Sequence, residues 1–173
     1  MRKRIIIAAA AAAAAAAVAG VVVLAAGAAA VATPASPPPL FSSSTVSVGR
    51  FGDIDVKTND ANPHHVKIQT KGESDVYVVM NTVQPGGNSG WHTHPGPSLI
   101  TVTQGTATFY DADDPTCTPR TVSAPNGTID PGDGHVHLLR NEGTVTLVTV
   151  TVAIIPAGAA RRIDAPAPAN CPI

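Results

Sequence analysis

Short runs of β-branched residues recur along this chain of 173 residues and restrict its fold more than any other feature. Clusters of Gly, Pro, Asn and Asp separate runs that are rich in Val, Ile and Thr, which is typical of strands joined by turns. The runs lie at residues 45–48, 53–57, 65–69, 75–80, 98–103, 106–110, 135–139 and 144–155. No segment after residue 44 shows a helical period. We therefore expect an all-β, single-domain barrel or jelly roll.

The N-terminal segment has the pattern of an export signal. Arg2, Lys3 and Arg4 precede an apolar stretch over residues 5–32, which ends in the small-x-small triplet Ala30-Val31-Ala32. This order predicts a signal peptide over residues 1–32, helical before cleavage, and hence a secreted or cell-surface protein. The alternative is an uncleaved signal anchor, because such a helix would be about 42 Å long and could cross a bilayer. Only in that case would the protein contact a membrane.

The rest of the chain divides by composition. Residues 33–44 are rich in Pro and Ser and predict a stiff, solvated linker. The predicted barrel follows over residues 45–155, and residues 156–173 form a tail rich in Ala and Pro. Removing three of the eleven basic residues with the signal leaves eight against twelve acidic ones. With no long basic run left, nucleic acid is not an expected partner.

Two cysteines, Cys117 and Cys171, remain after the signal. In an oxidising compartment a pair of cysteines is expected to form a disulfide. The bridge would hold the tail on the domain. Neither cysteine has an activating base nearby in the sequence, which argues against a catalytic thiol.

Four of the six histidines form two His-x-His pairs, His92/His94 and His135/His137. Residues two apart in a strand point to the same face, so each pair would direct two imidazoles the same way. Such an arrangement suits chelation of a metal ion. Two pairs on two predicted strands, each following glycines, make a stronger signal than one.

The spacing around these pairs resembles the cupin superfamily. Gly86, His92, His94 and Gly105 match the first cupin motif, Gly-x5-His-x-His-x3-4-Glu-x6-Gly. Gly134, His137 and Asn141 match the end of the second motif, although the preceding Pro131-Gly132-Asp133-Gly134 is one residue longer than the family's Pro-x-Gly. The resemblance covers roughly residues 76–155. It implies a cupin β-barrel with a metal site, but no particular reaction.

The resemblance implies metal ligands at His92, His94 and His137. The family's glutamate falls on Ser98, a poor ligand, so a site of three histidines with open positions is implied. A divalent ion there would keep its full charge and accept water, an anion or another small molecule. Zn suits three histidines, while Fe, Mn, Ni and Cu stay open. Ligation needs neutral histidines, so affinity should fall below about pH 6.5.

Several other residues have open roles. His135 is interpreted as a fourth ligand, as a second-layer partner or general base, or as a barrel-lining residue. Trp91 has the opposite strand parity to His92 and is expected to pack outside the barrel. Glu142 is expected to face outward, and His64 and His65 to lie in a solvated turn.

Two functions fit these observations. One is a metal-dependent enzyme, oxygenase-like, acting on a small molecule. The other is a non-catalytic module that binds a metal or a small ligand outside the cell. The run at 144–155 is apolar on both parities in its second half, which indicates burial on both faces or a homodimer interface.

Overall fold

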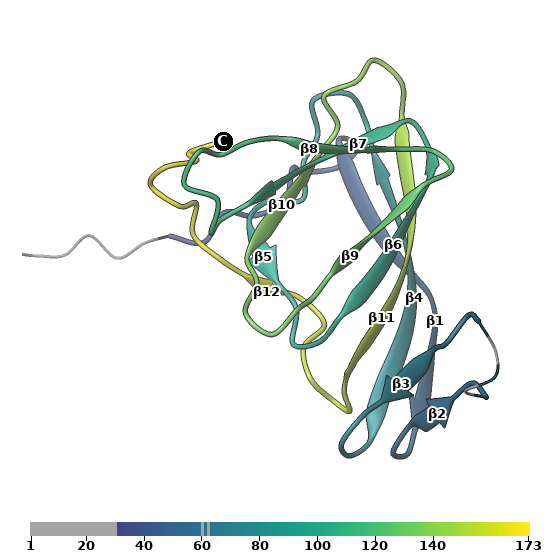
Figure 1. The fold of residues 1–173 in the computed structure, drawn as a ribbon. Helices are drawn as coiled ribbons and strands as arrows, with labels where there is room; N and C mark the ends of the chain where they lie inside the picture. The colour runs from purple at the N-terminus through teal and green to yellow at the C-terminus, as the bar shows by residue number, and fades with distance from the viewer. Residues whose placement is uncertain (1–30, 60, 62) are drawn as a thin grey trace, which may run out of the picture.

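The computed structural model describes residues 31–59, 61 and 63–173, and in this part of the chain every regular element is a strand (Figure 1). The predicted signal segment lies almost wholly outside the described residues. The first sheet orders β1 (Phe41–Phe51), β4 (Ser74–Val83), β11 (Leu147–Pro156), β6 (Ser98–Gln104) and β9 (Gly127–Asp130). The second orders β12 (Ile163–Asp164), β5 (His92–Thr93), β10 (His137–Arg140), β7 (Thr106–Asp111) and β8 (Arg120–Ser123). The two sheets make the predicted jelly-roll barrel. Within the described residues no helix could cross a membrane.

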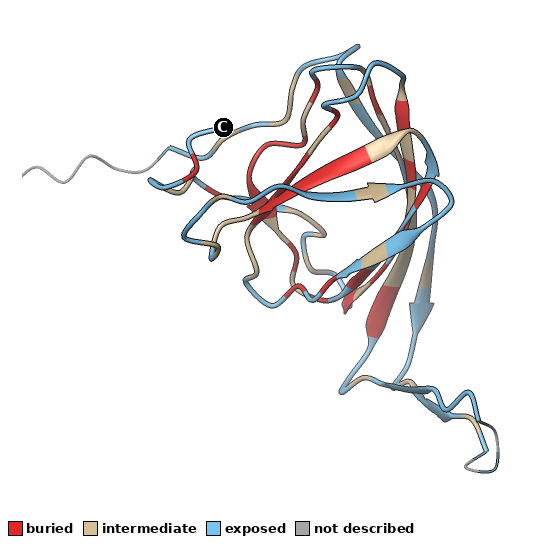
Figure 2. Cartoon of the chain, turned by 45° about the horizontal axis from the view of Figure 1, so that its top comes forward, coloured by how far each residue is buried: buried red, intermediate tan, exposed pale blue. Residues whose placement is uncertain are grey.

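The barrel interior is filled by strand residues of alternating parity. In β11 the buried residues alternate with partly exposed ones along the whole strand, as expected for a sheet with one face on the core. The interior cluster consists of Val83, Ile100, Val102, Ala107, Phe109, Leu139 and Leu147. Figure 2 shows the buried segments concentrated where the sheets face each other. The outer face of β11 is not buried in this chain, so burial on both faces was the wrong interpretation of residues 144–155. A homodimer stays a prediction.

The second sheet is buried on its outer face as well. Tyr110 and Leu138 have the opposite parity to the interior residues, and they pack with Trp91, Ala165 and Cys171 in a separate cluster. The tail supplies the last two of these residues. The C-terminal residues are therefore part of the folded domain, and Trp91 packs outside the barrel as predicted, under the tail.

Disulfide and backbone contacts fix the two ends of the domain. Cys117 and Cys171 are bridged, with their Cα atoms 5.3 Å apart. The backbone nitrogen of Thr33 donates to the Ala165 carbonyl at 3.0 Å, and Trp91 donates its own backbone N–H to the Thr33 hydroxyl at 3.0 Å. The segment predicted as a linker thus lies against the domain at its start, and strand β1 already begins at Phe41 rather than at Thr45.

A two-stranded ribbon extends from the barrel between β1 and β4 (Figures 1 and 2). Its strands, β2 (Asp55–Lys57) and β3 (Lys67–Gln69), pair only with each other. All six residues are exposed. The β-branched runs at 53–57 and 65–69 therefore form strands as predicted, but not strands of the barrel wall.

Backbone segments from both motifs cross closely beside the histidines. A Cβ atom on Gly96 would collide with the carbonyl oxygen of Ile154, and one on Gly132 would collide with the carbonyl oxygen of Gly96. Gly132 also has a φ of 69°, a left-handed conformation that favours glycine. Three layers of backbone can stack here only because these positions lack side chains.

Candidate metal centre

His92 and His137 are brought together by strand pairing. They are direct partners in the antiparallel pair of β5 and β10, so their side chains leave the sheet at neighbouring points. Their ring centroids are 4.5 Å apart. The two histidines, 45 residues apart in sequence, bring the two motifs together at this rung of the ladder.

His94 is positioned by the tail. Strand β5 ends at Thr93, so strand alternation alone does not fix the orientation of the His94 ring. Its Nδ1 instead lies 2.6 Å from the backbone carbonyl oxygen of Arg161. The ring is 4.9 Å from that of His92 and 5.5 Å from that of His137, measured between centroids. The structure therefore gathers all three predicted ligand residues into one cluster.

The three histidines offer a donor set that fits a metal ion. A ligating atom from each lies within 4.8 Å of the others, and all three residues are buried. The Nδ1 atom of His92 faces the Gly90 carbonyl at 2.8 Å, as that of His94 faces Arg161. A carbonyl can only accept, so these nitrogens carry the proton and Nε2 keeps its lone pair for a metal. This pattern of outer partners is the usual one for metal-bound histidine.

Burial keeps the cluster in the neutral form that ligation requires. It is the largest cause lowering the pKa of His92 well below its ordinary value, and the nearby His137 lowers it further. Burial likewise lowers the pKa of His94, and it lowers that of His137 to about 4 against the opposing effect of Asp130. All three imidazoles are therefore uncharged at neutral pH.

Asp130 lies beside His137, a position that the sequence did not predict for it. It ends β9, is 4 % exposed, and its Oδ1 lies 3.4 Å from Nδ1 of His137. The same oxygen accepts from His135 Nδ1 at 3.0 Å and from the Gly132 backbone nitrogen at 3.2 Å. No local sequence signal marks this role, since Asp130 only precedes the turn of the second motif.

His135 lies behind the cluster and not in it. It precedes β10, which begins at His137, so the parity rule does not apply to it. Its Nε2 is 3.5 Å from Asp111, and its ring stacks on that of His137 with centroids 5.6 Å apart. Its hydrogen bond to Asp130, which lies beside His137, fits the second-layer interpretation of His135, and the role itself stays a prediction.

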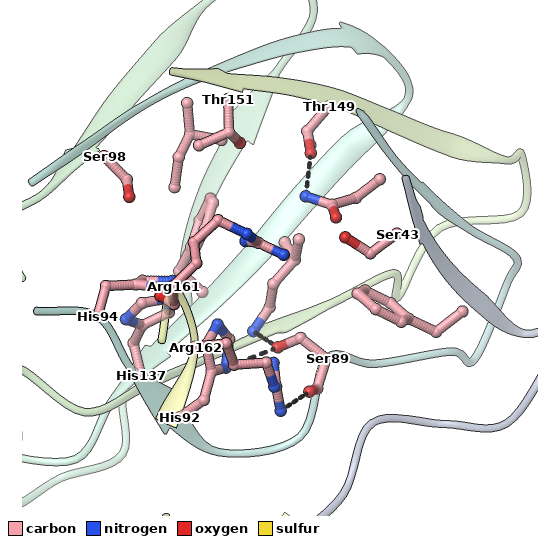
Figure 3. A pocket seen from close by; sticks show the side chains of 15 residues that line it. Ser43, Ser89, His92, His94, Ser98, His137, Thr149, Thr151, Arg161 and Arg162 are labelled. Carbon is pink, nitrogen blue, oxygen red and sulfur yellow. Dashed lines mark hydrogen bonds between the residues drawn. The ribbon is translucent and has the colours of Figure 1, made fainter. Parts of the chain in front are cut away.

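The cavity above the histidines has no acidic wall (Figure 3). About 80 Å³ is reachable by the centres of water molecules, against the roughly 10–15 Å³ that one water needs on this measure. The polar lining comprises Ser43, Asn81, Ser89, Ser98, Thr149, Thr151, Arg161 and Arg162, beside the three histidines. The apolar lining comprises Phe41, Ile100, Phe109 and Leu139. The cavity therefore accepts a compact ligand.

Ser98 lines this cavity at the position of the family's glutamate. The residue is 1 % exposed, and its hydroxyl oxygen has no hydrogen-bond partner among the described residues. A buried hydroxyl normally has a partner, so a ligand or water in the cavity is the expected one. An ion bound here would therefore have no carboxylate ligand from this position.

The remaining predicted residues lie away from the cavity lining. Glu142 is exposed and accepts a hydrogen bond from Tyr110 at 2.7 Å. His64 and His65 are exposed in the ribbon. Asn141 is fully buried, and its side-chain amide donates to the carbonyls of Val83 and Val145 at 2.8 Å each. The motif asparagine is thus a structural residue in this chain.

Comparison with known proteins gives matches in structure alone. No protein-family model and no curated protein matches the sequence. A double-stranded β-helix protein from Klebsiella pneumoniae is 23% identical over 66% of this chain and 84% of its own, with a TM-score of 0.45. A cupin superfamily protein from Desulfitobacterium hafniense is 14% identical over 64% and 79%, with a TM-score of 0.41.

A polyketide cyclase from Streptomyces resistomycificus is 19% identical over 51% of this chain and 60% of its own, with a TM-score of 0.43. Similarity of this degree carries no information about activity. The fold is assigned from the chain itself. Its two motifs, its two five-stranded sheets and its converging histidines give it the fold of the cupin superfamily.

Proposed function

We propose that this protein is an exported cupin that holds one divalent metal ion on His92, His94 and His137 and binds a small molecule at the open positions of that ion. The observation that carries the proposal is the buried cluster of three imidazoles, two of which, His92 and His94, have Nδ1 directed at a backbone carbonyl outside the cavity. Zn, Fe, Mn, Ni and Cu are all compatible with three nitrogen ligands.

The residues around the cluster have distinct tasks. The carbonyls of Gly90 and Arg161 orient His92 and His94, while the Asp130 carboxylate lies 3.4 Å from Nδ1 of His137. The cavity is partly open, and its walls of buried side chains would shield one side of a bound ligand from bulk water. A bound divalent ion would supply Lewis acidity toward an oxygen of that ligand.

Metal binding is tested by titrating the metal-free protein with Zn²⁺ in a calorimeter, together with elemental analysis of the protein from its native compartment. One ion per chain is expected. His92→Ala, His94→Ala and His137→Ala should each weaken binding by more than about 100-fold, since loss of an outer partner alone costs 10- to 100-fold. The matched control is His64→Ala in the exposed ribbon, which should bind as the wild type does. Equal affinity in wild type and His92→Ala would contradict the proposal.

The enzymatic form of the hypothesis, an oxygenase-like reaction on a small molecule, is favoured by the concave cavity that the three histidines line, since a small molecule there would lie next to a bound ion. The non-catalytic form is favoured by the lining, since no described acid reaches the cavity to act as a general base. Metal-dependent turnover that His92→Ala abolishes would decide for the enzyme. Ligand binding without turnover would decide for the binding module.

Export is supported by the disulfide, which is rare in reducing compartments. Cleavage after Ala32 would leave Thr33 as the first residue, and Thr33 is the residue that bonds to Ala165 and Trp91. We therefore expect the intact mass of the extracellular protein to be that of a chain that begins at Thr33. A full-length chain found only in membranes would instead indicate the anchor.

A further inference from the structure

The tail that completes the second sheet also brings two arginines to the cavity, and they differ in their partners. Arg162 is fully engaged: its Nη2 donates to the Ser89 carbonyl at 2.7 Å and its Nε to Asp164 at 2.6 Å. Arg161 contributes its backbone carbonyl to His94. Its guanidinium has no acidic partner within the described part of the chain. Arg161 therefore presents an unpaired, half-buried positive charge to the cavity.

The direction of the Arg161 side chain points to a ligand. Figure 3 shows it extending from the tail into the space between the histidines and the hydroxyls of Ser43 and Thr149. The side chain is partly buried, and the neighbouring Arg162 adds a second positive charge instead of compensating that of Arg161. A guanidinium remains charged nonetheless. An anion in the cavity would compensate this charge.

The lining defines the anion further. A guanidinium pairs with a carboxylate or a phosphate through two parallel hydrogen bonds. The same cavity is also lined by four apolar side chains, those of Phe41, Ile100, Phe109 and Leu139. These apolar side chains suit a short carbon body and not an inorganic oxyanion. The space open to the centres of water molecules is about 80 Å³, several times what one water needs, so the cavity suits a small molecule.

We propose that the cavity takes a small organic carboxylate, whose carboxylate group pairs with Arg161 while the rest of the molecule lies toward the histidine cluster. The inference rests on the proposed function, in that the cavity is taken to be the ligand site. Arg161 is then the residue that selects anionic over neutral ligands. Two positive groups, the guanidinium and a metal ion, would favour a dicarboxylate most.

Binding of malonate and of malonamide, its uncharged counterpart of the same shape, tests this inference by calorimetry on zinc-loaded protein. Malonate should bind and malonamide should not. Arg161→Gln should weaken malonate binding by roughly 10- to 100-fold, as expected for loss of a hydrogen-bonded charge partner, and Arg161→Lys should recover part of it. Lys67→Gln removes one positive charge from the exposed ribbon and should leave malonate binding unchanged. Fluorescence of Trp91 checks that each variant is folded.

The outcomes separate this inference from the proposed function. Zn²⁺ titration should give the same result for wild type and Arg161→Gln, because a backbone carbonyl and not the side chain holds His94. Equal malonate affinity in these two proteins would overturn the inference while leaving the metal site intact. Malonamide binding as tightly as malonate, or inorganic phosphate binding more tightly, would also overturn it. A wild type that binds malonate through Arg161 but takes up no metal would sustain the inference and refute the proposed function.

Discussion

Replacing Cys117 and Cys171 together with serine should make the protein markedly less stable. The two residues are 54 apart in sequence, and closing a loop of that size lowers the entropy of the unfolded chain by about 14 cal/mol/K. At 25 °C this corresponds to about 4 kcal/mol of unfolding free energy. Domains are typically stable by only about 5–15 kcal/mol, so the bridge would account for a large share.

The measurement is urea unfolding followed by the fluorescence of Trp91, the single tryptophan of the chain. Trp91 is completely buried in the cluster that contains Cys171, so it reports on the region that the bridge holds. With a slope of about 2 kcal/mol/M, the unfolding midpoint should fall by roughly 2 M urea. Reducing agent should shift the wild type equally and leave the double variant unchanged. A loss below about 1 kcal/mol would refute the chain-entropy reasoning for this bridge.

Four further predictions concern the site and the buried residues around it. Ser98→Glu should tighten metal binding and shift the preference toward Mn or Fe, since a carboxylate enters the cavity where an unpaired hydroxyl now lies. Titration of the variant with each ion checks this, and weaker binding of all ions would contradict it. Zn²⁺ affinity should persist below pH 6.5 and fall only toward about 4, because burial lowers the pKa of the ligand imidazoles. The same lowered pKa values predict that the metal-free protein loses stability as pH falls from 6.5 toward 4, since the unfolded chain then binds more protons than the folded one. Zn²⁺ titrations and thermal melts at several pH values check the two predictions. Loss of Zn²⁺ binding with a midpoint at pH 6.5 would contradict the first of them. Asn141→Ala should lower the unfolding free energy by about 2–4 kcal/mol, because the buried carbonyl of Val83 and the partly buried carbonyl of Val145 lose their donor. Zn²⁺ stoichiometry should stay at one, and a loss of metal with unchanged stability would contradict the structural role.

The strands and the three clustered histidines could be predicted from sequence because both depend on local patterns. Alternation of Val, Ile and Thr determines which residues can form a half-buried strand, whatever the strand packs against. The spacing in two cupin motifs was enough to select His137 over His135. The pairing of Cys117 with Cys171 followed from the chain having only two cysteines.

Tertiary structure decided which partners those patterns acquire. Parity predicted a shared direction for His135 and His137, but β10 begins only at His137, and His135 turns to Asp130 instead. The ribbon strands follow the same local rule as the barrel strands, and only pairing distinguishes them.

The tail is the clearest case, because nothing in its Ala/Pro-rich sequence indicates a role at the site. His94 and Arg161 are 67 residues apart, yet the carbonyl of one orients the ring of the other. Contacts over such separations depend on how the sheets close around the core, and local periodicity carries no record of that closure. The identity of the histidines was thus determined by sequence, and the charge of the cavity above them by the fold.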